Sequence, residues 1–207
     1  MFQGVRTSAT NPAIFHITHV DNLAGILASG LCADSVRIQN HLVSTNIGYS
    51  HIKQRRLNRK VPVADGGCLG DYVPFYFCPR SVMLYVISRG HQDYAGGQDS
   101  IIHLVSDMST AGFGRRWAFT DRHAELAHAV YYEDAPSLGQ VDWAVMNRRH
   151  WAESDVKERR QAEFLVSRHV PWSAFSLIGV RSTEVAEKVA LIVGGAPRVE
   201  VRPDWYY

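Results

Sequence analysis

Short runs rich in β-branched and aromatic residues recur along this chain, and no other feature restricts its fold more. Each of these runs is typical of a β-strand, and they read IFHIT (14–18), DYVPFYF (71–77), SIIHLVS (100–106), AEFLVSRHV (162–170), FSLIGVR (175–181) and RVEVRP (198–203). Helix-like runs lie between them, at NLAGILAS (22–29), TDRHAELAHAVYY (120–132) and TEVAEKVALIV (183–193). VMLYVIS (82–88) fits a helix or a strand. This mixture predicts an α+β fold with a curved mixed β-sheet and flanking helices.

The ends of the first predicted helix are marked by residues that favour caps. Asp21 stands before the apolar stripe of NLAGILAS, where its carboxylate could accept hydrogen bonds from the first free backbone N–H groups. Gly30 follows the stripe, and glycine readily adopts the backbone conformation that ends a helix. We therefore expect a strand over 14–18, then a helix that Asp21 caps and Gly30 ends.

The length and composition of the chain fit one globular domain. A chain of 207 residues can bury a substantial core, and 46% hydrophobic with 20% charged residues is typical of a water-soluble protein. No apolar run approaches the roughly 20 residues that cross a bilayer. The first dozen residues lack the succession of a secretory signal. We expect a single domain over 1–207, no membrane partner and a cytoplasmic location.

Cysteine and histidine spacing gives no sign of a metal centre. Cys32, Cys68 and Cys78 are odd in number and contain no CxxC pair, so free thiols are expected rather than a disulfide or a zinc site. His123 and His128 are five residues apart, which does not match the helical i, i+4 spacing of metal ligands.

Two long stretches without regular periodicity carry much of the positive charge. The first runs from Cys32 to Gly70 and includes HIKQRRLNRK (51–60), with five Lys and Arg in ten residues and a possible helix over 51–59. The second, 136–154, leads into a segment, 147–160, with five Lys and Arg in fourteen residues. Long irregular stretches in a compact domain usually serve as lids or binding loops. The net charge is only +2, so local patches are the better indication of an acidic partner.

Polar side chains occur where two predicted strands could present them to a site. His16 and Thr18 are two residues apart and so share one face of the first strand, opposite Phe15 and Ile17. Glu163 opens a later strand. No GxSxG, P-loop or GxGxxG motif follows a strand, which argues against a hydrolase elbow, a kinase-type site and a dinucleotide-binding fold.

These residues follow the order of three motifs of one superfamily. FHIT (15–18) resembles the first-strand motif of the ADP-ribosyltransferases, in which a His and a Thr or Ser two places later hold NAD. VPFYFCPRSVMLY (73–85) is similar to their second motif, in which a strand Tyr stacks on nicotinamide and a Ser and a second Tyr follow. AEFLV (162–166) resembles the third, a Glu that opens a late strand. Three motifs in order are far more specific than one.

The resemblance is closer to one family, the DarT toxins, which are DNA ADP-ribosyltransferases paired with a macrodomain antitoxin that removes the mark. The similar blocks span nearly the whole chain and read HITHVDNLAGIL, NIGYSHIKQRR, DYVPFYFCPRSVMLY, FTDRHA, VDWAVMNRRHW and RRQAEFLV. The resemblance implies an ADP-ribosyltransferase-like curved mixed β-sheet core with flanking helices and two long functional loops. Residues 33–60 would form the NAD-binding loop and helix, and residues 119–163 the turn-turn loop that recognises the base.

The same resemblance implies a role for each candidate residue. Glu163 would stabilise the positive charge that develops on the ribose, and Arg56 would be the functional arginine, with Arg55 as the alternative. Because the pKa of a guanidinium exceeds about 12, we expect Arg56 to clamp an anion rather than accept a proton, which leaves Glu163 as a candidate proton acceptor. The implied NAD contacts are His16, Thr18, Asn22, Arg56, Tyr76, Ser81, Met83 and Tyr85. The implied DNA contacts are Trp143, Arg148, Arg149, Trp151 and Lys157.

The acceptor and the partners are implied in the same way. The expected reaction transfers ADP-ribose from NAD, consumed as a co-substrate, to the N3 of a thymine in single-stranded DNA and releases nicotinamide. The expected protein partner is a macrodomain antitoxin, and no metal is expected. Guanine as the acceptor, RNA or protein as the substrate, and a non-catalytic nucleic-acid-binding module on the same fold stay open as alternatives. A pure binder has no need for Glu163, which argues against the last of these.

Overall fold

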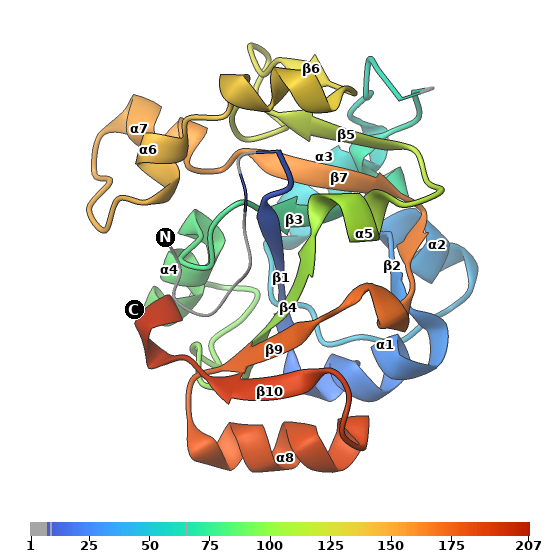
Figure 1. The fold of residues 1–207 in the computed structure, drawn as a ribbon, viewed down its shortest axis with the longest axis vertical. Coiled ribbons are helices and arrows are strands. Elements are labelled where there is room, and N and C mark those ends of the chain that lie inside the picture. The colour runs from blue at the N-terminus through green and yellow to red at the C-terminus, as the bar shows by residue number, and fades with distance from the viewer. Residues whose placement is uncertain (1–7, 9, 65) are drawn as a thin grey trace.

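The computed structural model describes residues 8, 10–64 and 66–207 (Figure 1). Its strands are β1 Ala13–His19, β2 Leu31–Cys32, β3 Tyr72–Tyr76, β4 Ile101–Asp107, β5 Trp117–Thr120, β6 Tyr131–Tyr132, β7 Glu163–Ser167, β8 His169–Val170, β9 Leu177–Val180 and β10 Arg198–Val201. Its α-helices are α1 Leu23–Ser29, α2 Asp34–Gln39, α3 Ser50–Asn58, α4 Val82–Arg89, α5 Met108–Gly112, α6 Trp143–Met146, α7 Ser154–Arg159 and α8 Thr183–Val193. The predicted α+β fold is confirmed. Most of the segment considered for a secretory signal lies outside the described residues.

An eight-stranded sheet runs through the molecule in the order β10-β9-β4-β1-β3-β7-β5-β6. Among the strands of the described residues, β9 and β10 pair in parallel and the other pairs of this sheet are antiparallel. Helix α8 lies along the β9–β10 edge and next to α1, while α3 lies near β7 at the other end (Figure 1). Phe15, Phe75, Phe119 and Phe164 are fully buried, because apolar clusters cover both faces of the sheet: Phe15 packs in one cluster and the other three in the cluster on the opposite face. Among the described residues, no helix is long and apolar enough to cross a bilayer.

The sheet divides between two neighbouring strands. β1 pairs with β4 along its whole length, but its register with β3 consists of Phe15 opposite Tyr76. The carbonyl oxygen of Pro74 accepts a hydrogen bond of 2.8 Å from the His16 ring instead of from a backbone N–H of β1. In a strand, the N and the C=O of one residue face the same neighbour, so the Pro74 nitrogen also faces β1, and proline has no N–H to donate. Its pairing with Leu165 of β7 is kept.

The start of the first helix differs from the prediction, and its end does not. Asp21 does not cap α1, because it lies within a 3₁₀ turn, Val20–Asn22, and its carboxylate pairs with Lys188 of α8 at 3.0 Å. The His19 side chain caps that turn by accepting the Asp21 N–H. Gly30 ends α1 with a φ of 75°, as expected. The predicted helix over 51–59 corresponds to α3, and 82–88 forms a helix, α4.

The helix predicted over 120–132 is wrong. Most of this stretch forms turns, and its end is the strand β6, which pairs with β5. Distant groups bind its backbone: the Ala124 N–H donates to Glu163, the Leu126 carbonyl accepts from Arg59, and the His123 N–H donates to the Glu158 carbonyl. These tertiary hydrogen bonds replace those that a helix would have formed within itself.

The second irregular stretch is more ordered than expected. It contains a 3₁₀ helix, Ala135–Gln140, and the short helix α6, and α7 begins where the stretch ends. The sequence also did not indicate β5, or the small sheet that joins β2 to β8. The three cysteines are free thiols, as predicted.

Candidate active site

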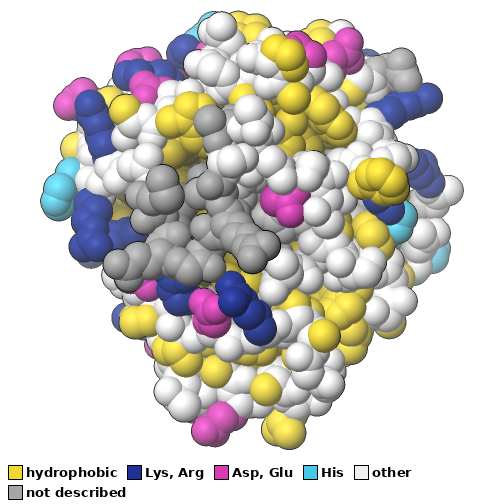
Figure 2. Space-filling view, viewed as in Figure 1, with side chains coloured by type: hydrophobic (Ala, Val, Ile, Leu, Met, Phe, Trp, Pro, Cys, Tyr) yellow, Lys and Arg dark blue, Asp and Glu magenta, His cyan; other side chains and the backbone are white. Residues whose placement is uncertain are grey.

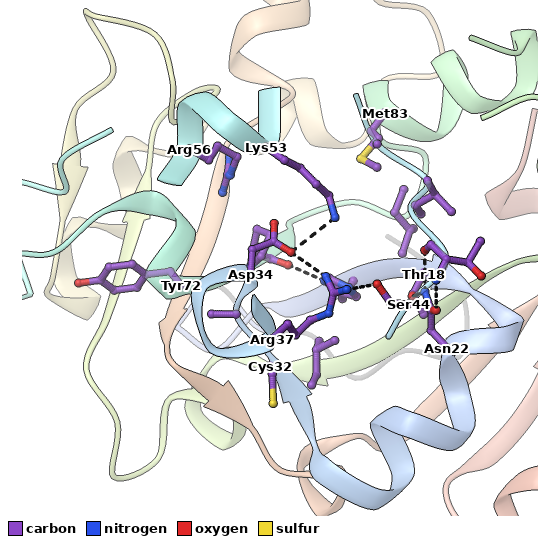
Figure 3. A pocket seen from close by; sticks show the side chains of 18 of the residues that line it. Thr18, Asn22, Cys32, Asp34, Arg37, Ser44, Lys53, Arg56, Tyr72 and Met83 are labelled. Carbon is purple, nitrogen blue, oxygen red and sulfur yellow. Dashed lines mark hydrogen bonds and ion pairs between the residues drawn. The ribbon is translucent and has the colours of Figure 1, made fainter. Parts of the chain in front are cut away.

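A cavity of about 470 Å³ opens where β1 and β3 diverge. Its walls come from β1, α1, α2, the 42–49 connection, α3, β3, α4 and β7. Motifs far apart in the sequence therefore meet here, as Figure 3 shows for several of the lining side chains. The predicted site residues that line it are His16, Thr18, Asn22, Arg56, Tyr76, Met83 and Glu163.

Glu163 and Arg56 form a bidentate ion pair at the wall of the cavity. The Arg56 Nη1 and Nη2 atoms lie 3.1 and 2.8 Å from the two carboxylate oxygens. The Glu163 side chain is only 3% exposed and that of Arg56 12%. Arg55, the alternative functional arginine, does not line the cavity and pairs with Glu125 instead. Of the two arginines, the structure brings Arg56 to the predicted catalytic acid.

Burial and this ion pair act in opposite directions on the two charges. Burial alone would raise the pKa of Glu163, but the nearby Arg56 charge, its hydrogen bonds and the Ala124 N–H outweigh burial and hold that pKa below its ordinary value. Burial alone would lower the pKa of Arg56, but the Glu163 carboxylate raises it overall. Burial also raises the pKa of Tyr76, and the Glu163 charge adds to this effect. Glu163 is therefore an anion and Tyr76 a neutral phenol at neutral pH.

His16 is a neutral ring at neutral pH. Burial lowers its pKa from 6.5 to about 4, although the hydrogen bond to the Pro74 carbonyl acts in the opposite direction. A carbonyl oxygen can only accept, so Nδ1 carries the proton and donates it to Pro74 at 2.8 Å. In the neutral ring Nε2 is then a hydrogen-bond acceptor.

The remaining predicted cavity residues support one another. The Asn22 amide donates to the Thr18 hydroxyl and to the Thr45 carbonyl, both at 3.0 Å, and accepts the Thr45 N–H at 2.7 Å. Asn22 thus fixes the 42–49 connection to the end of β1. The Tyr76 hydroxyl donates to the Met83 sulfur at 3.4 Å, so these two side chains form one continuous wall.

A charged cluster in the cavity was not predicted from the sequence. Asp34 of α2 lies 2.8 Å from Arg37 and 3.5 Å from Lys53 of α3, and Arg37 also donates to Ser44 (Figure 3). Two cations share one carboxylate there, which leaves a net positive charge in this part of the cavity. The i, i+3 spacing of Asp34 and Arg37 is a helical pairing pattern that could have indicated the cluster.

The cavity also includes His123, whose spacing from His128 does not fit a metal pair. His123 lines the wall, and burial lowers its pKa. The next residue, Ala124, donates its backbone N–H to Glu163 Oε1 at 3.2 Å. Within residues 8, 10–64 and 66–207, no group of three His, Cys, Asp or Glu side chains is close enough to hold a metal ion.

Two of the predicted NAD contacts lie outside the cavity. Ser81 is fully buried and caps α4, accepting the Leu84 N–H at 3.1 Å. Tyr85 is 41% exposed on another side of α4. Its ring makes T-shaped contacts with Trp151 and Tyr207, with centroid distances of 5.3 and 5.2 Å. The structure therefore does not bring these two side chains to the other candidates.

The predicted DNA contacts lie in and around the α6–α7 connection. Trp143 packs edge-on against Phe77, with ring centroids 5.4 Å apart, and its indole N–H donates to the Leu138 carbonyl, so the core holds this ring. Trp151 is half-buried, whereas Arg148, Arg149 and Lys157 are exposed. Figure 2 shows Lys and Arg side chains at the left edge of this face, where Figure 1 has the α6–α7 connection.

The three motif residues His16, Tyr76 and Glu163 thus come from three neighbouring strands, β1, β3 and β7, and surround one cavity. This arrangement on a divided sheet is the one expected for an ADP-ribosyltransferase. Residues 15–207 match the family described as "ssDNA thymidine ADP-ribosyltransferase, DarT". The chain belongs to the DarT family, which confirms the predicted family and enzyme class.

Individual relatives agree with this assignment. A DNA ADP-ribosyl transferase of Thermus sp. (strain 2.9) is 44% identical over 98% of this chain and 99% of the relative. The structure of Thermus sp. 2.9 DarT in complex with ADP-ribosylated ssDNA is 44% identical, covers 98% of this chain and 99% of that chain, and has a TM-score of 0.91. The structure of the same Thermus protein in complex with NAD+ is 42% identical, covers 94% of this chain and 97% of that chain, and has a TM-score of 0.86. A transferase–glycohydrolase fusion protein of Thermosipho africanus is 24% identical over 92% of this chain and 48% of the fusion.

Proposed function

We propose that this chain transfers ADP-ribose from NAD to a thymine base in single-stranded DNA and releases nicotinamide. The observation that carries the proposal is the ionised Glu163, held by Arg56 at the wall of a cavity that also contains His16 and Tyr76. The family description, which names thymidine in single-stranded DNA, supports the choice of acceptor.

Glu163 supplies a fixed negative charge where the reaction develops a positive one. Breaking the bond between ribose and nicotinamide gives the ribose oxocarbenium character in the transition state, and a buried, preorganised carboxylate stabilises such a charge. Arg56 and the Ala124 N–H fix the orientation of this carboxylate. Arg56 stays protonated, so its chemical part is to orient Glu163 and to offset negative charge on the acceptor base. Removal of the thymine N3 proton then falls to Glu163.

Residues 33–60 supply the part of the cavity that suits the anionic half of NAD. Arg37 and Lys53 bring two positive charges against the single charge of Asp34, which fits a pyrophosphate. The Tyr76–Met83 wall is apolar and partly aromatic, which fits nicotinamide. His16, with Nε2 as an acceptor, suits a ribose hydroxyl donor.

Residues 119–163 supply the acceptor side. His123 reaches the cavity from this segment, and the exposed Arg148, Arg149 and Lys157 can meet phosphates while Trp151 offers a ring for stacking. A base that is already unpaired spares the enzyme the free energy of flipping it from a duplex.

We also propose that the chain is a toxin whose partner is a macrodomain antitoxin. An ADP-ribose on thymine N3 would block base pairing, so an enzyme that removes it would be the counterpart of one that adds it. The transferase–glycohydrolase fusion of Thermosipho africanus, in which both activities occur in one protein, supports this pairing. A cytoplasmic site of action stays a prediction that cell fractionation would test.

Mass spectrometry of oligonucleotides tests the acceptor directly. Single-stranded oligonucleotides with thymine or guanine as the only variable base are incubated with NAD, and Glu163→Gln serves as the inactive control. We expect one ADP-ribose on the thymine oligonucleotide and none on the guanine one. Labelling of guanine alone would overturn the choice of base, and labelling by Glu163→Gln at the wild-type rate would overturn the role of Glu163.

A further inference from the structure

Two neighbouring arginines of α3 point to different parts of the molecule. Arg56 reaches Glu163 in the cavity, whereas the Arg55 Nε and Nη2 atoms lie 3.2 and 2.8 Å from the two carboxylate oxygens of Glu125. The Glu125 side chain is only 10% exposed, while that of Arg55 is 58% exposed. The carboxylate is therefore held against α3 by a bidentate contact, the strongest geometry for this kind of pair.

Glu125 belongs to a turn, residues 123–126, that has no helix or strand of its own. Its backbone is tied to several other elements. The Ala124 N–H donates to Glu163 of β7, and the Leu126 carbonyl accepts from Arg59 of α3 at 3.1 Å. The His123 N–H donates to the Glu158 carbonyl of α7, and the Ala124 carbonyl accepts from Tyr131 of β6. His123 begins the turn and lines the cavity. The turn therefore connects α3 to the proposed catalytic acid through hydrogen bonds to side chains, and not through a β-ladder.

We propose that Arg55 and Glu125 are positioning residues for the acceptor side of the site. Their ion pair holds the 123–126 turn on α3, which keeps the Ala124 N–H on the Glu163 carboxylate and His123 in the cavity wall. The inference rests on the proposed function, in which residues 119–163 receive the acceptor base. Neither Arg55 nor Glu125 lines the cavity, so the pair acts through the turn and not by touching a substrate.

The mechanism predicts which substrate is affected. Loss of the pair removes one of the contacts that hold the turn on α3, so the acceptor meets a less rigid wall, and part of the binding free energy of DNA goes into ordering it. The Asp34, Arg37 and Lys53 cluster on the other side of the cavity keeps its contacts. Binding of NAD should then change little.

A charge exchange tests this proposal. Arg55→Glu, Glu125→Arg and the double variant are compared with wild type by steady-state kinetics, varying oligonucleotide at saturating NAD and then NAD at saturating oligonucleotide. We expect each single variant to lower kcat/KM for the oligonucleotide by about fivefold, with KM for NAD within about twofold of wild type. The double variant, in which the pair can re-form with the charges exchanged, should recover most of the loss.

A control removes an arginine–carboxylate pair that lies on the surface, away from the cavity. Arg181 and Asp99 are ion-paired at the surface and line no part of the cavity, so Arg181→Glu should leave both KM values unchanged. Thermal unfolding of every variant tests for general loss of fold. The neutral Arg55→Gln and Glu125→Gln remove the ion pair without placing two like charges side by side. A double variant no better than the combined singles, or equal shifts in both KM values, would overturn the proposal. Failure of wild type to label the oligonucleotide would instead overturn the proposed function.

Discussion

The centre of the cavity and the α6–α7 connection are both rich in charge, but they hold it in opposite ways. In the centre, Glu163 and Arg56 are almost fully buried and bound to each other. In the connection, Arg148 and Arg149 are exposed, and within the described part of the chain their side chains form no ion pair. A buried pair depends on the position of each atom, whereas exposed cations act through their number. Single substitutions should therefore be severe in the centre and mild in the connection.

The largest effect is expected for Glu163→Gln. The amide keeps the shape and one acceptor for Arg56 but removes the negative charge, so we expect kcat for ADP-ribose transfer to fall about 10²- to 10³-fold. Stability should fall too, since Arg56 keeps a buried charge without a carboxylate partner. Single-turnover labelling of a thymine oligonucleotide measures the first effect and thermal unfolding the second. A fall in transfer no larger than that caused by changing one exposed arginine would break the comparison.

The next largest effect is expected for Arg56→Lys. An ammonium keeps the charge but cannot hold both oxygens of Glu163, so the carboxylate loses its fixed orientation. We expect a loss of about 10- to 100-fold in kcat, since small misplacements in a site are costly. Arg55→Lys is the matched comparison on the same helix: it loses the bidentate contact to Glu125, so kcat/KM for the oligonucleotide should fall, but by less than the about fivefold expected for Arg55→Glu. If Arg55→Lys were the more damaging of the two, the roles of the neighbours would be exchanged.

A smaller effect, on the salt dependence of DNA binding, is expected for the α6–α7 connection. Replacing Arg148, Arg149 and Lys157 together with Gln should make the negative slope of log affinity against log salt shallower by about 2, since each phosphate contact of a single strand contributes about 0.7. Fluorescence anisotropy of a labelled oligonucleotide at several salt concentrations measures this slope. NAD binding should not change, because these residues do not line the cavity. An unchanged slope would remove them from the DNA contact.

The smallest effect on activity is expected from mild acid. His16 and fully buried His103 have pKa values lowered by burial from 6.5 to about 4, so the unfolded chain binds more protons between these values. The free energy of unfolding should therefore fall as the pH drops from about 6.5 to 4, by up to about 1.4 kcal/mol per pH unit for His103. Transfer should persist at pH 5, because the pKa of Glu163 lies below its ordinary value. If stability and ADP-ribose transfer were both lost by pH 5.5, the acid sensitivity of the fold and that of the reaction would not be separate.

The sequence predicted most where chemistry and strand pattern coincide. His16, Tyr76 and Glu163 lie in β-type runs that follow the order of the three superfamily motifs, and the cavity brings all three together. The 123–126 turn could not be predicted, because its backbone is satisfied by Arg59 and Glu163, which are distant in the sequence.

The two tryptophans of the basic stretch also could not be distinguished from the sequence. Trp143 and Trp151 lie in one basic stretch and look equivalent in the sequence, yet one packs on Phe77 and the other contacts Tyr85 and Tyr207 at the surface. Local composition indicates that a stretch can meet DNA, but only tertiary packing decides which ring is left to do so. Ser81 is a similar case, since a serine before a helix is as well suited to capping as to binding a ligand.

Pro74 has a consequence for the thermodynamics of ligand binding. Because this residue has no N–H to offer β1, the backbone ladder lacks a hydrogen bond at this position whether or not a ligand is present. The divide beside the cavity is thus favoured by the covalent structure of β3, and a ligand breaks no backbone hydrogen bond of Pro74 when it enters. A ligand that meets a preformed wall loses less of its affinity to ordering the protein, so association should carry a small conformational entropy cost on this side of the site.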